Sequence, residues 1–510
     1  MHLILLFLVI PLYLLVNLVQ TTLHHRYLLS IPGPLITRFT KLWYFNRVRL
    51  RGFERDNIRL HEKYGPVVRI APDHYSIRDR VAVRTVYGNG SRFAKSAWYE
   101  GWKHPDPNRW TLFPDRDIRR HGESRKRFAS LYSMSSLVHY EAFVDNCADI
   151  LAQRLRERDQ CGSTLNLGHW FQCYAFDVIG EITFGQRFGF LDQGHDIEGT
   201  ITALQSLMTY STLVGIYPEW HPRLFGILSW FKSSGAAGRA YIMQFVQDKI
   251  SSHAPYSPTQ DDVEGRAPKA QDFVEKMMLA RDKNPEKVTD YHLYMMGLSN
   301  VVAGSDTTAI SLSSIMYHLL HNPEVLAKLR AEVDSFTTLG RCSPRVTFKE
   351  SQEMPYLQAV IKEALRMHSA TGLPLWRVVP AGGAEISGYR FPEGAVVGVN
   401  TWVAHYDEEV FPEASTFQPE RWIEAEQDPE RLRLMNDMYM PFGLGSRTCL
   451  GKHISILEIS KLIPRLVRDF DFTTSTARWT TENSWFVKPT DFEVQVRARL
   501  DSKTERLRAE

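Results

Sequence analysis

Phe442-Gly443-Leu444-Gly445-Ser446-Arg447-Thr448-Cys449-Leu450-Gly451 is a glycine-rich loop that carries a single cysteine near the end of the chain. Glycines let a backbone turn tightly and approach a flat ligand closely. The residues that follow, 452–466, have the pattern of a helix, and a helix N-terminus favours the thiolate form of a nearby cysteine. Arg447 adds a cation that can meet either the sulfur or the anionic edge of a cofactor. A thiolate bound to haem iron favours cleavage of the O–O bond. If Cys449 is such a ligand, the rest of the chain should contain the parts of an oxygen-activating enzyme.

The composition is that of a large globular protein in a reducing compartment. The chain has 510 residues, of which 44% are hydrophobic and 12% aromatic, so it can bury a substantial core. Its net charge of +3 gives no support for nucleic-acid binding. Its 5 cysteines are widely scattered and odd in number, which fits neither a disulfide framework nor a zinc site.

The N-terminus is apolar except for Asn17 over residues 3–19, and this run carries no charge. As a helix this run would be about 25 Å long, slightly short of a bilayer core of about 30 Å. A cleaved signal peptide is the alternative, but the run lacks both a basic n-region and a small-residue cleavage site. Basic residues follow the run, and such residues stay on the cytoplasmic side. We therefore expect a transmembrane anchor over 1–20, a linker with the proline hinge Ile31-Pro32-Gly33-Pro34 over 21–34, and a body that faces the cytosol.

The body of the chain, 35–510, is predicted to be one large domain that is mainly helical with small β-sheets. No linker-like stretch divides it, and no internal repeat is visible. Helical patterns dominate from about residue 83 to residue 370. Strand patterns lie on either side, at 67–70, 74–77, 377–380, 385–389, 395–400 and 492–497. The polar segment 254–269 is expected to be an exposed loop.

A long segment, 290–321, is predicted to be a buried helix, because it is apolar on nearly all faces and is followed by Pro323. Asp306 is its only charged side chain after Asp290 and sits in Ala303-Gly304-Ser305-Asp306-Thr307-Thr308. The small residues at 303 and 304 would let a ligand approach the helix backbone. An adjacent acid and hydroxyl can relay protons. The alternative is a buried Asp capped by neighbouring hydroxyls in a distorted helix, and the segment fits both interpretations equally.

A second cluster combines one acid with two guanidinium groups. Glu363 and Arg366 share one face of a predicted helix over 356–368. Arg421, in Pro419-Glu420-Arg421-Trp422, offers the second guanidinium. Because the neighbours of Glu363 are apolar, we expect burial and interpret this cluster as structural, not catalytic.

A basic run, His121-Gly122-Glu123-Ser124-Arg125-Lys126-Arg127, contains a further candidate site. Lys126 fits a solvated helix face. His121 and Arg125 are four residues apart and can point together at one anionic group. Arg377, which follows Gly372-Leu373-Pro374, adds a later cation.

The cysteine loop, the Ala-Gly-Ser-Asp-Thr-Thr segment, the Glu-x-x-Arg helix and the Pro-Glu-Arg-Trp segment occur in the order and spacing of the cytochrome P450 family. The resemblance covers nearly the whole chain and is strongest to membrane-bound fungal members, which share the Pro-Gly-Pro hinge and the His-x-x-x-Arg pattern. It implies the P450 fold and a haem-thiolate monooxygenase. It also implies a single-pass protein of the endoplasmic reticulum membrane whose catalytic domain faces the cytosol.

The resemblance assigns roles to individual residues. Cys449 would be the axial thiolate of haem b. Asp306 and Thr307 would be the acid–alcohol pair that delivers protons during oxygen activation. The other assignments are Glu363, Arg366 and Arg421 as a structural triad, and His121, Arg125, Arg377 and Arg447 as partners of the haem propionates. Two departures from the family pattern are His121, where many members have tryptophan, and Trp422, which replaces the commoner phenylalanine and is expected to change only packing.

Similarity places the substrate pocket in regions rich in large apolar and aromatic side chains. The candidate lining residues are Trp98, Tyr99, Val302, Leu373 and Trp485. Ordinary core packing is the alternative for each aromatic residue, but together they suggest a largely apolar cavity. A terpenoid, polyketide or alkaloid intermediate of secondary metabolism would fit such a cavity, and so would a fatty acid or a xenobiotic.

The resemblance therefore implies a monooxygenase, expected to be a monomer, that uses O2 and receives electrons from NADPH through NADPH-cytochrome P450 reductase. The reductase would dock on the thiolate side of the haem, near Lys126, Arg127 and Lys452. A thiolate-haem isomerase or dehydratase that needs no external electrons is a second hypothesis, which the intact Asp306–Thr307 pair disfavours. A haem-binding sensor or carrier is a third, and the acid–alcohol pair and aromatic cavity disfavour it.

Overall fold

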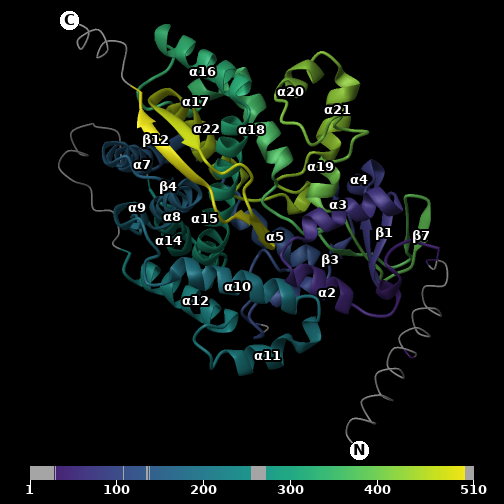
Figure 1. Ribbon diagram of the computed structural model, residues 1–510. Coiled ribbons are helices and arrows are strands. Elements are labelled where there is room, and N and C mark those ends of the chain that lie inside the picture. Colours follow the sequence, from purple (N-terminus) through teal and green to yellow (C-terminus); the bar gives the residue numbers. More distant parts are fainter. Residues whose placement is uncertain are drawn as a thin grey trace, which may run out of the picture.

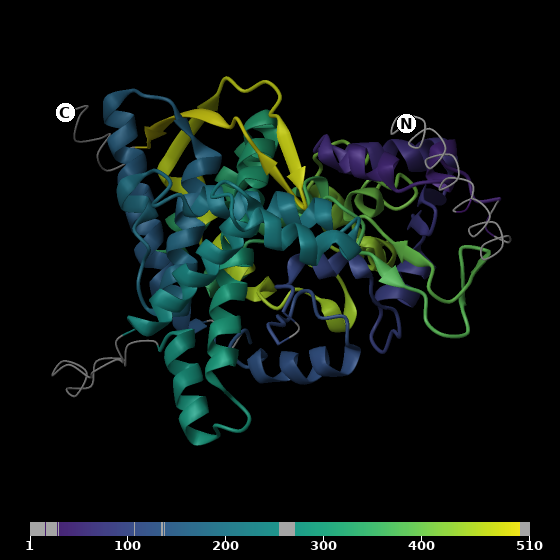
Figure 2. The same ribbon diagram turned by 90° about the horizontal axis from the view of Figure 1, so that it is seen from below.

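The computed structural model describes residues 16, 28, 30–106, 108–133, 136, 138–253 and 271–499. Within these ranges the chain is mainly helical with small β-sheets, which confirms the predicted fold class. Figure 1 shows most of the helices from the middle of the chain on one side of the molecule, and β1 and β7 at the opposite edge. The strands near the C-terminus, such as β12, lie toward the helical side in both Figure 1 and Figure 2.

The helices have the following bounds. The α-helices are α2 (Leu42–Arg49), α3 (Phe53–Tyr64), α4 (Arg80–Tyr87), α5 (Ile118–Phe128), α7 (Glu141–Cys161), α8 (Leu167–Phe184), α9 (Phe190–Gln193), α10 (Thr200–Val214), α11 (His221–Leu228), α12 (Gly235–Ser251), α14 (Phe273–Lys283), α15 (Asp290–His321), α16 (Pro323–Thr338), α17 (Phe348–Gln352), α18 (Pro355–Met367), α19 (Thr401–His405), α20 (Glu420–Ala425), α21 (Pro429–Met438) and α22 (Lys452–Asp469). The 3-10 helices are η2 (Leu35–Arg38), η3 (Ala97–Trp102), η4 (Val138–Tyr140), η5 (Pro218–Trp220) and η6 (Gly445–Arg447).

The strands form small sheets from segments far apart in the sequence. They are β1 (Val67–Ala71), β2 (His74–Ile77), β3 (Ala94–Lys95), β4 (Leu165–Asn166), β5 (Arg377–Val378), β6 (Ala384–Ile386), β7 (Tyr389–Phe391), β8 (Val396–Gly398), β9 (Phe470–Thr474), β10 (Thr481–Ser484), β11 (Phe486–Pro489) and β12 (Glu493–Ala498). The largest sheet has the order β1-β2-β8-β5-β3, and a second has the order β4-β12-β9. In the first sheet the antiparallel pairing of β3 with β5 sets Lys95 opposite Arg377.

The long apolar segment forms the single helix α15, with the predicted bounds. The helix begins beside His292, whose Nδ1 accepts the Thr289 N–H (3.2 Å), and Pro323 opens the next helix. Helix α8, which is buried over most of its length, packs against α15. A Cβ on Gly304 would lie 2.9 Å from the Ile179 side chain of α8. The glycine in α15 is therefore needed for close helix packing as well as for space beside a ligand.

The structure contradicts the predicted location in the endoplasmic reticulum membrane. Among the residues that the structure describes, none of the helices is both long and apolar enough to cross a membrane. The predicted anchor, 1–20, lies outside the described residues except for Val16, and the predicted loop over 254–269 lies outside them entirely.

Candidate active site

The cysteine loop is shaped by a turn that only glycine can make. The Cys449 N–H donates to the Phe442 carbonyl (2.8 Å), which closes the loop on itself. Gly445 has a φ of 59°, and a Cβ at this position would lie 2.0 Å from the Tyr87 carbonyl oxygen. A side chain at Gly445 would therefore both strain the backbone and clash with the end of α4.

The Cys449 side chain is surrounded by protein, and its exposed surface faces a central cavity. Burial raises the pKa of its thiol above the usual value, whereas the N–H groups of Gly451 and Lys452 and the nearby Arg125 guanidinium lower it. The start of α22 thus acts in the predicted direction, but burial outweighs it. Coordination to a metal ion would stabilise the thiolate outright.

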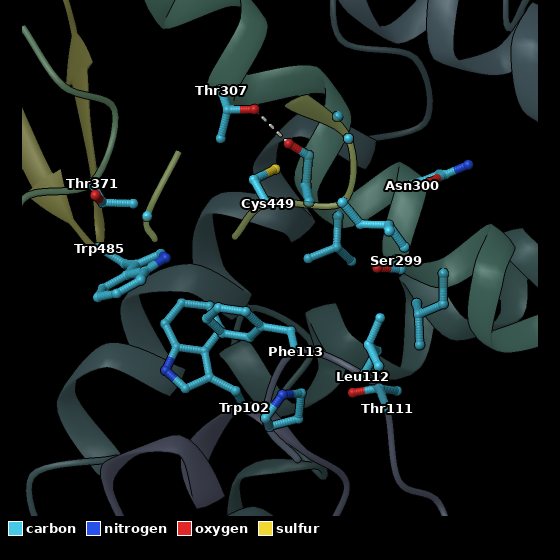
Figure 3. A pocket seen from close by; sticks show the side chains of 18 of the residues that line it. Trp102, Thr111, Leu112, Phe113, Ser299, Asn300, Thr307, Thr371, Cys449 and Trp485 are labelled. Carbon is cyan, nitrogen blue, oxygen red and sulfur yellow. Dashed lines mark hydrogen bonds between the residues drawn. The ribbon is translucent and has the colours of Figure 1, made fainter. Parts of the chain in front are cut away.

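The cavity has a volume of about 350 Å³, and its lining includes residues of α15 and of the cysteine loop. Figure 3 shows Thr307 of α15 beside Cys449, and the aromatic rings of Trp102, Phe113 and Trp485 farther from the sulfur. The site therefore places the Cys449 thiol beside a hydroxyl of α15 and across the cavity from a group of aromatic rings.

The four residues predicted to meet an anionic cofactor edge all line this cavity. They are His121, Arg125, Arg377 and Arg447. Arg125 Nη1 donates to the Thr448 carbonyl (2.7 Å), and Arg447 Nη1 donates to the Asp115 carbonyl (2.8 Å). The Arg447 Nη2 atom is buried without a hydrogen-bond partner among the described residues. Burial and the neighbouring cations lower the pKa of His121 to about 3, so this ring is neutral at pH 7.

Lys95 joins these residues at the cavity, although sequence analysis did not single it out. Its side chain is buried, its Nζ donates to the Phe113 carbonyl, and it lies 4.3 Å from the ring centroids of Tyr99 and Phe113. Burial and the charges of Arg377 and Arg447 lower its pKa well below the usual value. Lys95 reaches the cavity because β3 pairs with β5, which sets it opposite Arg377. No local sequence pattern around Lys95 indicates this pairing.

This arrangement fits haem b, a planar iron group with two carboxylates on one edge. The cations Lys95, Arg125, Arg377 and Arg447 gather at the cavity. Among the described residues, the one carboxylate that acts on both Lys95 and Arg447 is Asp115, and Arg120 already pairs with it at 2.7 Å. Buried positive charge without counter-ions is unfavourable, so two propionates would neutralise it. The Cys449 sulfur is available in the same cavity as a metal ligand.

The structure orients the two residues of the predicted acid–alcohol pair differently. The Thr307 hydroxyl faces the cavity and donates to the Ala303 carbonyl (2.7 Å), the bond drawn in Figure 3. Asp306 is buried and does not line the cavity. Its Oδ1 accepts a hydrogen bond from Gln172 of α8 and lies 3.4 Å from Lys488 Nζ of β11. Proton transfer between the two side chains therefore requires a rotation of Asp306 or an intervening water.

The predicted Glu363 cluster is assembled in the core, where its residues are buried. Arg366 Nη2 and Nε donate to the two Glu363 oxygens at 2.7 and 3.0 Å, and Arg421 Nε donates to Oε1 at 2.9 Å. The Trp422 indole N–H also donates to Glu363 Oε2 (2.9 Å). The expectation that Trp422 changes only packing is therefore wrong, because its N–H completes the shell around this carboxylate.

His405 connects this cluster to the cysteine loop. Its Nδ1 lies 2.9 Å from the Arg366 carbonyl, and its Nε2 accepts the Met440 N–H at 2.9 Å. Burial and the nearby Arg366 lower the pKa of His405 to about 3, so the ring is neutral and its Nδ1–H donates to the carbonyl. Met440 lies two residues before the loop, so this chain of contacts fixes where the loop begins.

Of the predicted pocket residues, Tyr99, Val302 and Trp485 line the cavity, whereas Trp98 and Leu373 do not. Trp98 supports the lining from behind, with its ring centroid 4.9 Å from that of Trp485. Trp485 has a φ of 80°, which is strained for an aromatic residue, so the surrounding structure must fix its ring at the cavity. Lining residues that the sequence did not single out include Leu112, Phe113, Ile179, Arg239, Tyr294 and Glu458.

Comparison with known proteins agrees with this geometry. The family model for Cytochrome P450 matches residues 34–496 of the chain. Pisatin demethylase of Fusarium vanettenii is 36% identical over 92% of this chain and 90% of its own length. A cytochrome P450 monooxygenase of Aspergillus terreus is 36% identical over 87% of this chain and 90% of its own length. The cytochrome P450 monooxygenase gsfF of Penicillium aethiopicum is 34% identical, and the match covers 94% of each chain.

Proposed function

Because this chain belongs to the cytochrome P450 family, whose monooxygenases use haem b with a cysteine thiolate on the iron, we propose that Cys449 provides that thiolate. A monooxygenase of this family takes a lipophilic substrate, O2 and electrons from a redox partner. We further propose that this one hydroxylates, or oxidises in a related way, an intermediate of secondary metabolism.

The observation that carries the Cys449 assignment is its position in a cavity with more cations than acids: among the described residues, Asp115 is the one carboxylate that acts on both Lys95 and Arg447, and Arg120 already pairs with it. Haem, when bound, supplies the activation of O2 that no side chain provides. The protein's contribution is to bind and orient it: Cys449 on the iron, and Lys95, Arg125, Arg377, Arg447 and the neutral His121 along the propionates. The turn at Gly445 and the contacts of Met440 fix the loop that presents the sulfur.

We propose that Thr307 and Asp306 deliver protons to the cavity. The Thr307 Oγ1 already lies in the cavity, and rotation away from the Ala303 carbonyl lets its O–H donate toward a substrate or water there. Asp306 would return a proton to that hydroxyl. Gln172 and Lys488 hold the Asp306 carboxylate in its resting position, so the relay would begin with the release of these contacts.

We propose NADPH-cytochrome P450 reductase as the electron donor, docking on the thiolate side of the haem. Lys126, Arg127 and Lys452 are exposed, and Arg125 of the same helix contacts the cysteine loop. Neutralising Lys126 and Lys452 together should slow the first electron transfer at low salt, because surface charge acts mainly on the encounter rate. Substrate affinity should not change. Equal reduction rates in the double variant and the native protein at low salt would remove this surface from the proposal.

Product analysis tests the function directly. The holoenzyme, the reductase and NADPH are incubated with candidate terpenoid, polyketide and alkaloid substrates, and oxygenated products are identified by mass spectrometry with labelled O2. Incorporation of one oxygen atom, coupled to NADPH consumption, is expected. Conversion that proceeds without NADPH would instead favour an isomerase or dehydratase.

The Cys449→Ser substitution tests the ligand assignment. We expect loss of the ferrous–CO absorption that is typical of thiolate ligation. Ser446→Ala, in the same loop but not among the residues that line the cavity, is the matched control and should keep that absorption. A thiolate-type spectrum that survives in Cys449→Ser would assign the ligand elsewhere.

A further inference from the structure

The cavity wall away from Cys449 is formed by η3, α12 and the start of α15. In Figure 3 Trp102, the last residue of η3, lies across the cavity from Cys449 and Thr307. Arg239 of α12 and Tyr294 of α15 line the same cavity, and Arg239 Nη1 donates to the Trp102 carbonyl (2.8 Å). We call Trp102, Arg239 and Tyr294 the distal cluster.

Arg239 is a buried cation without an acidic partner among the described residues. Its side chain is only 7% exposed. Its Nη2 donates to the Gly101 carbonyl (2.9 Å) and to Ser211 Oγ (3.0 Å), which are neutral, and its buried Nε finds no partner within the described part of the chain. Burial lowers the pKa of the guanidinium to about 10, so it stays charged at pH 7. The three neutral acceptors orient the guanidinium but leave its charge uncompensated.

The two other members of the distal cluster also have unused donors. The Tyr294 hydroxyl and the Trp102 indole N–H are both buried and have no hydrogen-bond partner among the described residues. Burial raises the pKa of Tyr294 to about 12, while the Arg109 and Arg239 charges act in the other direction. The neighbouring Tyr291 differs, because its hydroxyl donates to the Trp110 carbonyl (2.6 Å).

Three residues that line one cavity thus carry three unsatisfied donors and one uncompensated charge, which favours an acceptor with negative charge. Buried polar groups in folded proteins are almost always paired, and each exception needs an explanation. Apolar side chains, among them Leu207, Leu298 and Val302, line the same cavity. A molecule that satisfies both features has an apolar body and one anionic oxygen group.

We propose that the substrate of this enzyme is a lipophilic carboxylic acid, or a phenol acidic enough to be ionised, whose oxygen anion binds the distal cluster. This inference rests on the proposed function, because it names the substrate class of the same cavity. Anchoring at the distal cluster leaves the opposite end of the substrate toward Thr307 and Cys449. The oxidised carbon is therefore remote from the acidic group. A site built to pair with a polar group also discriminates strongly against analogues that lack it.

Binding measured without turnover tests the proposal. Isothermal titration calorimetry of the holoenzyme, with no reductase or NADPH, compares 2-naphthoic acid, 2-naphthol bearing electron-withdrawing chlorines, 2-naphthamide and 2-ethylnaphthalene at pH 7.5. We expect at least one of the two anions to bind about tenfold or more tightly than both neutral ligands. Selectivity for the acid alone identifies a carboxylate, and selectivity for the chlorinated naphthol identifies a phenolate. Failure of both anions to bind more tightly than the amide would overturn the proposal.

Two variants and a control locate the effect. Tyr294→Phe removes one hydroxyl from the distal cluster and should reduce the preference for the anion about fivefold, with unchanged affinity for 2-ethylnaphthalene. Arg239→Met should abolish the preference. Tyr291→Phe, which removes a hydroxyl that is already bonded, should leave it intact. An anion preference that Tyr294→Phe and Arg239→Met both retain would place the anion elsewhere. Because no electron transfer is needed, a missing product in the turnover assay would sink the monooxygenase proposal without affecting this result.

Discussion

At the scale of single residues, Thr307 is the clearest target, because its hydroxyl is the one side chain of the predicted pair that lines the cavity. Thr307→Ala should leave haem in place and divert reducing equivalents to hydrogen peroxide, since protons would reach the cavity through less ordered water. The measurement is the ratio of NADPH consumed to product and to peroxide. Thr308→Ala is the control, because Thr308 Oγ1 instead donates to Ser455 Oγ (3.2 Å). Tight coupling in Thr307→Ala would remove this residue from the relay.

Lys95 should act in opposite directions on the haem-free and haem-bound protein. In the haem-free protein the side chain is buried among Arg377 and Arg447, which lowers its pKa, so Lys95→Met should raise the urea midpoint of unfolding. In the holoenzyme the same substitution removes a cation that we assign to a propionate. Haem transfer to an acceptor protein should then be about tenfold faster, as expected for one lost hydrogen bond to a charged group.

Lys126→Met is the control for this experiment, because Lys126 is exposed on α5. It should change neither the unfolding midpoint nor the rate of haem transfer. If Lys95→Met destabilises the haem-free protein and the holoenzyme alike, Lys95 supports packing and does not bind the cofactor.

At the scale of elements, the sequence predicts the helices and motifs that a local pattern specifies. It does not predict contacts that depend on the pairing of segments far apart in the chain. Helix α15 has the predicted bounds because a long apolar run and Pro323 specify it locally. The thiol, the Glu363 cluster and the cations at the cavity were predictable because their motifs are compact. Lys95 was not, since its place depends on a strand pair that joins it to Arg377, 282 residues later in the chain. The orientation of Asp306 away from the cavity also depends on a distant partner, Lys488.

The contact between α18 and α20 offers a test of one such missed interaction. Trp422→Phe keeps most of the buried ring but removes the N–H that donates to Glu363 Oε2. A buried carboxylate that loses one of its donors should lower the free energy of unfolding by about 1–3 kcal/mol. Urea unfolding of the holoenzyme measures this change, and haem retention shows whether the effect reaches the cysteine loop.

Trp479→Phe is the matched control for the α18–α20 contact. This indole stacks on Tyr317 with ring centroids 4.0 Å apart, whereas the indole that donates to Glu363 is that of Trp422. Trp479→Phe should lower the free energy of unfolding only by the amount expected for the smaller buried ring. If the two tryptophan variants lose the same stability, the indole N–H contributes nothing and the original expectation of a packing role would be restored.

At the scale of the whole molecule, burial forces many histidines to remain neutral. The pKa is lowered to about 3, with burial as the largest cause, for His61, His121, His318 and His405. In the unfolded chain the histidine pKa is about 6.5. Between these values the unfolded state binds more protons than the folded state, so stability is complete above about pH 6.5 and falls as the pH falls toward 3. The protein should therefore unfold in mild acid with net proton uptake.

His61 isolates this effect from the cofactor, because it lies outside the cavity lining and bonds to Ser76 Oγ (2.8 Å) and the Gly65 carbonyl (2.9 Å). His61→Gln should lower stability at pH 7 through imperfect hydrogen bonds. It should also make the decline from pH 6 to pH 4 shallower by about 1.4 kcal/mol per pH unit, since one proton fewer is taken up on unfolding. Urea unfolding across this range measures the slope, and His195→Gln, at an exposed position, should leave it unchanged. A slope that His61→Gln does not alter would mean that other groups drive the acid transition, because a neutral buried imidazole must contribute to it by linkage.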